Sequence, residues 1–467
     1  MNSRHALLTF LMLASGACSL HKVEAPPPPD FVPESFTQQG NAVLADEWWM
    51  VFDDEQLNSL MATALSENRS LRGAWARLEA AEAGLRIATG TRLPSVDANT
   101  SVSRSKSQFF GVNRTSSLYS LGISAAYELD VWHRLSARQQ AAVSDRDAAA
   151  SDGETVALML TASIANTYYV ATEQQQQLAL LDEQEKVNQQ FLEIIEARFG
   201  AGQATAVDVY QQREQLAAIQ VQVPAARQRL ARSEHLLSTL CGRPPGLGMV
   251  DAAKILPALP PLPATGLPID LLERRPDVRA ARARLVAQDH RLGAAMADRY
   301  PSLRFSVSTG ASSVSVSDIF SNWVWSLAGN VVAPIFDGGR RKAEVDRNHA
   351  VLAQLLAAYE DTVLTGLREV EDALVVEVEQ QELLARLAKQ QELADAAYGS
   401  GRARYLEGVG NFLTVLTELS ASQRIQRTRL SAHQALISNR ISLYQALGAT
   451  PMGAHNEDGQ VPSGDPQ

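Results

Sequence analysis

The sequence is poor in the residues on which most enzyme and metal sites depend. Its 467 residues contain two cysteines, Cys18 and Cys241, and eight histidines scattered along the chain. No His-Glu-x-x-His or Cys-x-x-Cys spacing occurs, and no glycine-rich stretch has the spacing of a Walker or dinucleotide loop. We therefore expect no enzyme activity, no metal, no dissociable cofactor and no disulfide between the two cysteines.

Negative charge exceeds positive charge, and long apolar runs are scarce. The net charge is −10, and no basic block or aromatic ladder interrupts the sequence, which argues against nucleic acid as a partner. Beyond the N-terminus, no stretch reaches the roughly eighteen apolar residues that a transmembrane helix needs. If the chain crosses a membrane, a structure other than a helix must do so.

The N-terminus predicts export and a lipid anchor. A positively charged start precedes the apolar run 6–14, which is too short to span a bilayer but suits a signal peptide. Small residues then lead into Cys18, as in bacterial lipoproteins, so Cys18 is the predicted site of a covalent lipid such as palmitate. Ser15 stands where that motif usually has Leu or Val. The alternative is a plain signal peptide that is cleaved near Ala17 and leaves a free thiol.

Two long helices dominate the predicted structure. The patterns over 136–199 and 340–404 each predict a helix of roughly sixty residues, about 90 Å long at about 1.5 Å per residue. In the second helix, Leu352, Val363 and Leu374 repeat every eleven residues, a period that predicts a nearly straight helix. A second apolar set widens the stripe, so neighbours on two sides are expected, and such helices can close into a tube. The alternative is an antiparallel coiled coil with a solid core.

Internal repetition predicts a tandem duplication. Pro94 recurs as Pro301 at an offset of 207, and Arg134 recurs as Arg340 at an offset of 206. The one-residue slip falls before the long helices, where it does not rotate their faces. Each half is predicted to contain a helix, a β-hairpin, a long helix, a tip turn and a returning helix. Pro224 predicts a bend or a local loss of hydrogen bonding in the first returning helix.

This order divides the chain into six predicted segments. The linker between the halves contains seven prolines and should be extended. The segments are a signal peptide, 1–17; a lipid anchor and extended Pro-rich linker, 18–45; a first repeat, 46–241; a Pro-rich equatorial strap, 242–268; a second repeat, 269–448; and a disordered tail, 449–467.

Four segments between the helices alternate like β-strands. Ser, Thr, Val and Tyr are abundant over 95–107 and 117–129, and the polar loop 106–116 joins these two stretches. Similar stretches occur at 303–316 and 323–332. Strands of about ten residues with one polar and one apolar face suit a water-filled transmembrane barrel. Four strands cannot close a barrel, and backbone groups in lipid must be paired, so three chains would pool twelve. The alternative is a pair of soluble hairpins packed on the helices.

Glycine-containing turns end both long helices. Glycine commonly ends a helix, and Thr205 and Asn411 are expected to cap the two returning helices. The turn glycines are Gly200, Gly202, Gly408 and Gly410.

The chain resembles the TolC-like outer membrane factors of bacteria, and among them the OprM/NodT lipoprotein branch. The resemblance covers about 36–448 and rests on the order of elements, the Trp48-Trp49 pair, the Leu-Leu-Glu-Arg-Arg-Pro-Asp-Val-Arg stretch at 271–279 and both Arg-aromatic-x-x-Gly turns. It implies a mixed α+β membrane protein, a homotrimer whose 12-stranded outer-membrane β-barrel continues into a 12-helix periplasmic tunnel. It also implies the exit duct of a tripartite efflux pump that exports drugs or other toxic compounds.

The resemblance further implies partners and a gate. The tip turns would dock to a periplasmic adaptor. The inner-membrane partner would be a pump of the resistance-nodulation-division type. Relatives close the tunnel with acidic side chains beyond the second tip turn, but those positions here are Thr414 and Thr417. Asp208 and Glu418 are the alternative candidates for the gate charge, although both are also typical of solvated surface carboxylates.

Two other functions remain open at this point. One is the outer-membrane channel of a type I protein-secretion system, and the other is a periplasmic coiled-coil scaffold anchored by Cys18. Two local predictions concern structure alone: Trp48 and Trp49 should be packing residues, and Arg274, Arg275 and Asp277 should form an ion-pair or capping group near the strap.

Overall fold

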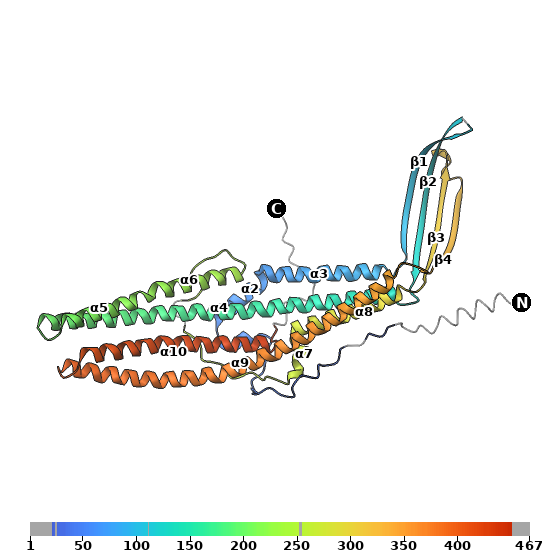
Figure 1. Cartoon of the computed structure of the whole chain (residues 1–467). Coiled ribbons are helices and arrows are strands. Elements are labelled where there is room, and N and C mark those ends of the chain that lie inside the picture. The colour runs from blue at the N-terminus through green and yellow to red at the C-terminus, as the bar shows by residue number, and fades with distance from the viewer. Residues whose placement is uncertain (1–20, 24–25, 111, 252–254, 451–467) are drawn as a thin grey trace. The chain divides into compact units, whose positions relative to one another are not determined.

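The computed structural model describes residues 21–23, 26–110, 112–251 and 255–450 (Figure 1). This part of the chain is mostly helical and contains one four-stranded sheet. The predictions for the signal peptide, for Cys18 and for the tail beyond Thr450 lie outside the described residues.

The chain folds into two compact units. The first unit is Met1–Pro27, Ala76–Ser151 and Arg279–Thr362, and the second is Pro28–Trp75, Asp152–Val278 and Val363–Gln467. The chain passes between them five times, and four of these passages fall inside helices. These helices are α3(Arg69–Gly90), α4(Arg134–Gly200), α8(Pro276–Ala297) and α9(Arg340–Leu406).

The sheet belongs to the first unit and is antiparallel in the order β1-β2-β3-β4 (Figure 1). The predicted loop 106–116 is wrong, because the ladder between β1 and β2 continues to the pair Phe109 and Val112. The segment is rich in Ser and other polar residues, which are also typical of turns, so composition alone did not locate the turn. The second connection holds a 3-10 turn, η3(Val316–Asp318). The strands are β1(Ser95–Phe109), β2(Val112–Leu129), β3(Ser302–Ser313) and β4(Trp323–Val332).

The first helix of each predicted half is broken rather than continuous. The region 47–90 contains η1(Trp48–Phe52), α2(Glu55–Glu67) and α3. Asn68 separates α2 from α3 because its side chain accepts a hydrogen bond from the Leu71 N–H, at 2.9 Å, and donates one to the Leu240 carbonyl, at 2.8 Å.

The second interruption has a different cause. The region after the strap contains η2(Pro268–Asp270), α7(Leu271–Arg274) and α8. Arg275 has ψ 118° and ends α7, because the residue before a proline avoids the helical region.

The long helices begin and end within two residues of their predicted bounds, and α4 and α9 each contain 67 residues. The returning path of the first is α5(Ala206–Gln220) and α6(Gln222–Leu240), divided at Val221, three residues before Pro224. The helix is thus interrupted close to Pro224, where the sequence predicts a bend or a local loss of hydrogen bonding. The returning path of the second, α10(Phe412–Ala446), contains no proline and is unbroken.

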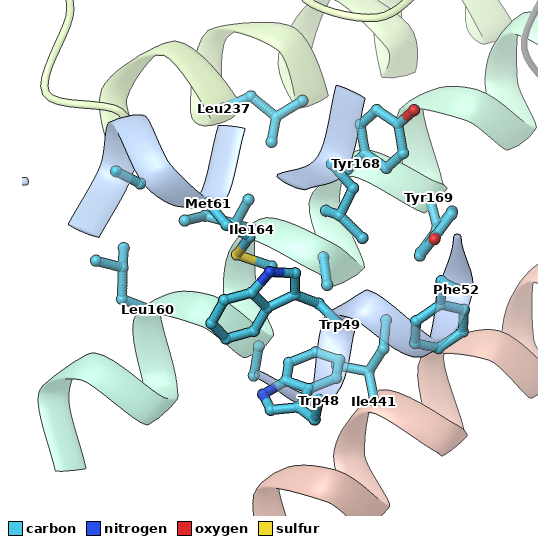
Figure 2. Packing of buried hydrophobic residues seen from close by; sticks show 14 of the residues in the cluster. Trp48, Trp49, Phe52, Met61, Leu160, Ile164, Tyr168, Tyr169, Leu237 and Ile441 are labelled. Carbon is cyan, nitrogen blue, oxygen red and sulfur yellow. The ribbon is translucent and has the colours of Figure 1, made fainter. Parts of the chain in front are cut away.

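The largest apolar core lies in the second unit (Figure 2). Trp48 is fully buried, and its ring stacks on Tyr444 with centroids 5.3 Å apart, while Trp49 packs edge-on against Trp48. Both tryptophans are therefore packing residues, as predicted. Cys241 is a free, buried thiol of the same core.

Helices α4 and α9 are long, but both carry charged residues along their length. Over the described residues, none of the helices combines the length and the apolar character that a membrane-spanning helix requires.

Candidate functional site

The sheet has one apolar face and one polar face. Residues that lie directly opposite on antiparallel strands point to the same side, and successive residues point to opposite sides. One row across the sheet is Val96, Ala125, Val307 and Leu327. The adjacent row, on the other face, is Asp97, Ser124, Ser308 and Ser326.

The apolar face is exposed in the single chain. Trp325 is 75% exposed and Leu327 is 67% exposed. Large contiguous apolar patches of this kind mark a surface that contacts a membrane or another protein. A sheet that is apolar on one face and rich in serine on the other can separate lipid from water.

The strands meet the helices of the first unit at a charged and aromatic junction. Glu128 accepts hydrogen bonds from Arg134 and, at 3.1 Å, from Arg304. Trp132 donates from Nε1 to the Pro301 carbonyl, at 2.8 Å, and a cavity of 270 Å³ lies among these residues. The junction links the β1–β2 and β3–β4 hairpins near the start of α4.

Two aspartates hold the starts of the long helices. Asp130 accepts from the backbone N–H groups of Leu135, at 2.9 Å, and Ser136, at 2.7 Å. Asp337, which is also half-buried, accepts from the Gly339 N–H, at 3.1 Å, and from the Arg341 N–H, at 3.3 Å. Burial would raise the pKa of Asp130, but the Ser136 hydroxyl and the two N–H donors outweigh it and lower that pKa.

Both tip turns have the predicted caps. Thr205 caps α5 in a capping box, because its hydroxyl accepts from the Asp208 N–H, at 3.2 Å, while Asp208 Oδ2 accepts from the Thr205 N–H, at 2.7 Å. Asn411 caps α10 by accepting from the Leu413 N–H, at 3.0 Å. Asp208 is thus committed to a helix cap, a role for its carboxylate that the sequence analysis did not assign.

The turn glycines have different structural reasons. Gly202 and Gly408 have φ of +74° and +80°, a conformation that favours glycine. A Cβ atom on Gly410 would lie 2.7 Å from the Tyr405 backbone N, so the close approach of the backbone requires glycine there. Gly200 is exposed and has open space around it.

An aromatic cluster joins the two tip turns within the second unit. Phe191 of α4 stacks on Phe412 of α10, with centroids 6.1 Å apart, and Tyr405 packs against both. The Arg198 guanidinium, at the end of α4, lies 4.7 Å from the centre of the Tyr405 ring, at the end of α9. The first tip turn is therefore fixed to the second one.

The remaining candidate gate residues lie on the first two turns of α10. Thr414 and Thr417 are exposed, and the Thr417 hydroxyl donates to the Leu413 carbonyl, at 2.8 Å. Glu418 is half-buried. The spacing of these residues, three and four apart, places them on one face of the helix, whereas Asp208 lies on α5.

The predicted arginine group is a structural ion pair in which Arg275 is buried and its carboxylate partners are partly exposed. Arg275 donates to Asp277, at 2.7 Å, to Glu369, at 2.7 Å, and to the Ala446 carbonyl, at 3.0 Å. Burial alone would lower the pKa of the Arg275 guanidinium, but the hydrogen bonds and charges of Asp277 and Glu369 outweigh it and raise that pKa. Arg274 forms no ion pair among the described residues.

The sequence analysis missed an ion pair in which both side chains are buried. Arg440 on α10 donates to Glu377 on α9, at 2.6 Å, and to the carbonyls of Pro260 and Pro261 in the strap. Both charged side chains are almost completely buried. The apolar residues Ile437, Ile441 and Tyr444 follow one another at spacings of about one helical turn and mark the buried face of α10. Arg440 lies among them, and this position in the sequence could have indicated a buried, paired arginine.

A ladder of buried amides was also missed. Asn188 on α4 donates to Gln423 Oε1 on α10, at 3.1 Å, and its carbonyl accepts from Gln212 on α5, at 3.0 Å. Gln184 continues the ladder by donating to the Gln423 carbonyl, at 3.1 Å. These contacts fix the lengthwise register of α4 and α10 within the second unit.

Comparisons with known proteins agree with this arrangement. The family model "Outer membrane efflux protein" matches residues 60–243 and 267–449. The pyoverdine export outer membrane protein OpmQ of Pseudomonas aeruginosa is 34% identical over 391 residues, which are 79% of this chain and 80% of OpmQ. The toluene efflux pump outer membrane protein TtgF of Pseudomonas putida is 32% identical over 394 residues, 81% of this chain and 80% of TtgF.

Solved structures show the same fold. The outer-membrane channel OprN matches with a TM-score of 0.86 and 29% sequence identity, over 92% of this chain and 99% of OprN. These findings confirm the resemblance to the outer membrane factors, which are channel-type efflux proteins rather than enzymes. The chain belongs to the outer membrane efflux protein family.

Proposed function

We propose that this chain is the outer-membrane exit duct of a tripartite efflux pump. The observation that carries the proposal is the sheet with an exposed apolar face, a serine-rich opposite face and outer strands β1 and β4 that each pair along one edge. Unpaired strand edges are not tolerated in lipid, so further strands must complete the sheet.

The proposed assembly is a homotrimer in the outer membrane. Three copies of the four strands make a 12-stranded barrel. The two duplicated halves, 46–241 and 269–448, each supply a long helix and a returning helix, so three chains make a 12-helix periplasmic tunnel. The strap 242–268 joins the halves, and Arg440 fixes it through the Pro260 and Pro261 carbonyls. Segment 18–45 links the body to a covalent lipid on Cys18 after removal of 1–17, and 449–467 forms the tail.

The proposed cargo is small organic compounds, a class suggested by the names of the pyoverdine, toluene and solvent exporters among the relatives. The duct has no energy source of its own, so a resistance-nodulation-division pump in the inner membrane must drive transport. A periplasmic adaptor would contact the tip turns at Gly200, Gly202, Thr205, Gly408, Gly410 and Asn411.

The proposed gate lies just beyond the tip turns. Thr414, Thr417 and Glu418 share one face of α10, where three copies would meet around the tunnel axis. Asp208, the fourth candidate, lies on α5, where its carboxylate already takes part in the capping box. Opening would be a shift of packed helices between two arrangements.

Imaging and conductance of the detergent-purified protein test this proposal. We expect threefold cylinders with a helical tube of about 90 to 100 Å, and stepwise conductance increases in a planar lipid bilayer. A deletion strain should become more sensitive to toxic organic compounds and should keep its secreted proteins. Single rods that do not conduct would favour a scaffold, and loss of a secreted protein would favour a type I secretion channel.

The lipid anchor has a separate test. Growth with a labelled palmitate analogue should label the wild-type protein, and Cys18→Ser should abolish the label. The Cys18→Ser protein should still be recovered from the outer membrane as a trimer if the strands, and not the lipid, hold it there. Labelling that persists in Cys18→Ser would contradict the proposed attachment site.

A further inference from the structure

The β1–β2 hairpin is longer than its neighbour. The pairing of β2 with β3 ends at Tyr119 and Ser313, whereas the pairing of β2 with β1 continues to Val112. Residues 112–118 and their partners on β1 therefore extend beyond β3, by about 23 Å at about 3.3 Å per residue.

Two cations continue the apolar face onto this extension. Val102, opposite Tyr119, is the last apolar residue of β1 on that face, and the next two residues on the same face are Arg104, opposite Ser117, and Lys106, opposite Thr115. Both cationic side chains are exposed, and neither forms an ion pair among the described residues. Apolar surface thus changes to positive charge within one step of the ladder.

The extension is positive in a chain that is negative overall. Between Asp97 and Glu128 the sequence contains three cations and no carboxylate. The third cation, Arg114, lies opposite Ser107 and points to the polar face. The β3–β4 connection contributes one carboxylate, Asp318, which accepts a hydrogen bond from the Ser317 hydroxyl, at 3.1 Å.

We propose that Arg104 and Lys106 bind the phosphate groups of glycolipid headgroups in the outer leaflet of the membrane. This inference rests on the proposed function, which places the apolar face in lipid and the hairpin end outside. Arg104 then lies about 7 Å beyond Val102, and Lys106 about 13 Å beyond it, at the depth of the headgroups. A guanidinium and an ammonium on one face suit clustered phosphates.

The occupant is a lipid rather than a soluble anion because the cations continue an apolar band. A soluble anion would gain nothing from Val102 and Tyr119, whereas acyl chains pack on that band while the headgroup meets the cations. The contact would hold a collar of phosphorylated glycolipid around the duct.

Lipid binding to the purified wild-type protein in phosphatidylcholine nanodiscs tests the proposal, with diphosphorylated lipid A as the probe. The double variant Arg104→Gln/Lys106→Gln should bind lipid A at least about tenfold more weakly than wild type. The matched control is Arg114→Gln, which removes one cation from the opposite face and should bind as wild type does. Dephosphorylated lipid A should bind wild type as weakly as lipid A binds the double variant.

Two results would overturn the proposal: equal lipid A binding by wild type and the double variant, or an equal loss in Arg114→Gln. Full competition by inorganic phosphate would also overturn it, in favour of a free-anion site. Conductance of the same samples separates this inference from the proposed function. If the wild-type protein forms pores but binds lipid A without using the two cations, only this inference fails. If it forms no pores, the proposed function fails, and this inference with it.

Discussion

The second unit buries charge, whereas the sheet of the first unit exposes hydrophobic side chains. Arg440 and Glu377 are buried but fully paired inside the chain, while Trp325 and Leu327 are mostly exposed. Both arrangements depart from the usual distribution of a soluble protein. The difference indicates that the buried Arg440–Glu377 pair is satisfied within one chain, whereas the apolar face of the sheet needs surroundings that the chain does not supply.

The largest expected effect comes from breaking the buried pair. Arg440→Ala should lower the free energy of unfolding by about 3–5 kcal/mol, because it leaves the Glu377 carboxylate buried and unpaired and frees two strap carbonyls. Urea denaturation of the detergent-solubilised protein, followed by circular dichroism, measures the change.

Arg368→Ala is the matched control for this experiment. Arg368 forms an ion pair with Asp372 on the same helix, but both side chains are more than 60% exposed, so little change is expected. If Arg440→Ala were as mild as Arg368→Ala, the claim that the second unit depends on buried charge would be wrong.

The next effect tests the apolar face of the sheet. Leu327→Arg places a charge near the middle of β4 on that face and should cost about 2–4 kcal/mol in a bilayer. Folding of the protein into lipid vesicles, measured by urea titration, gives the value. Ser326→Arg is the control, because its side chain points to the opposite face. Equal penalties at the two positions would contradict the assignment of lipid and water to the two faces.

The sequence predicted those features that depend on local patterns. The long helices were placed to within two residues because a period sustained over sixty residues averages out local errors, and the caps at Thr205 and Asn411 follow from side-chain chemistry. Arg440 and Glu377 are 63 residues apart, so their contact depends on how α9 and α10 align. The alternation of the strands was visible, but the length of the β1–β2 hairpin was not, because serine-rich segments suit both loops and strands.

A smaller effect should follow at the start of α4. Asp130→Asn removes a carboxylate oxygen that accepts from the Ser136 N–H and hydroxyl, and should cost about 1–2 kcal/mol. Because folding lowers the pKa of Asp130, its contribution is present above the unfolded pKa, near 3.8, and is lost as pH falls below it. Unfolding measured across acidic pH should thus be less pH-dependent in the variant.

Asp337→Asn provides the comparison for this position. Asp337 is half-buried like Asp130, but it accepts longer hydrogen bonds at the start of α9, from the Gly339 N–H, at 3.1 Å, and the Arg341 N–H, at 3.3 Å, so the effect should be smaller. A larger loss at Asp337 than at Asp130 would mean that the lengths of these hydrogen bonds do not determine the strength of the caps.

The smallest effect is local to the tip. Thr205→Ala removes one side of the capping box and should cost about 0.5–1 kcal/mol, seen as about two- to fivefold faster amide hydrogen exchange in the first turn of α5. Asn411→Ala removes a single bond and should accelerate exchange in α10 by less. Changes in exchange that spread along α4 would show instead that the aromatic cluster at the tip depends on the cap.

The passages between the two units have a consequence for how the protein can evolve. Four of the five lie inside helices, and only the passage at Pro27 and Pro28 lies outside one. A protease cannot release either unit at an exposed linker, and recombination cannot exchange one unit without cutting a helix. The two units are inherited as a single module, and new substrates or partners must be accommodated by point changes and loop insertions rather than by domain exchange.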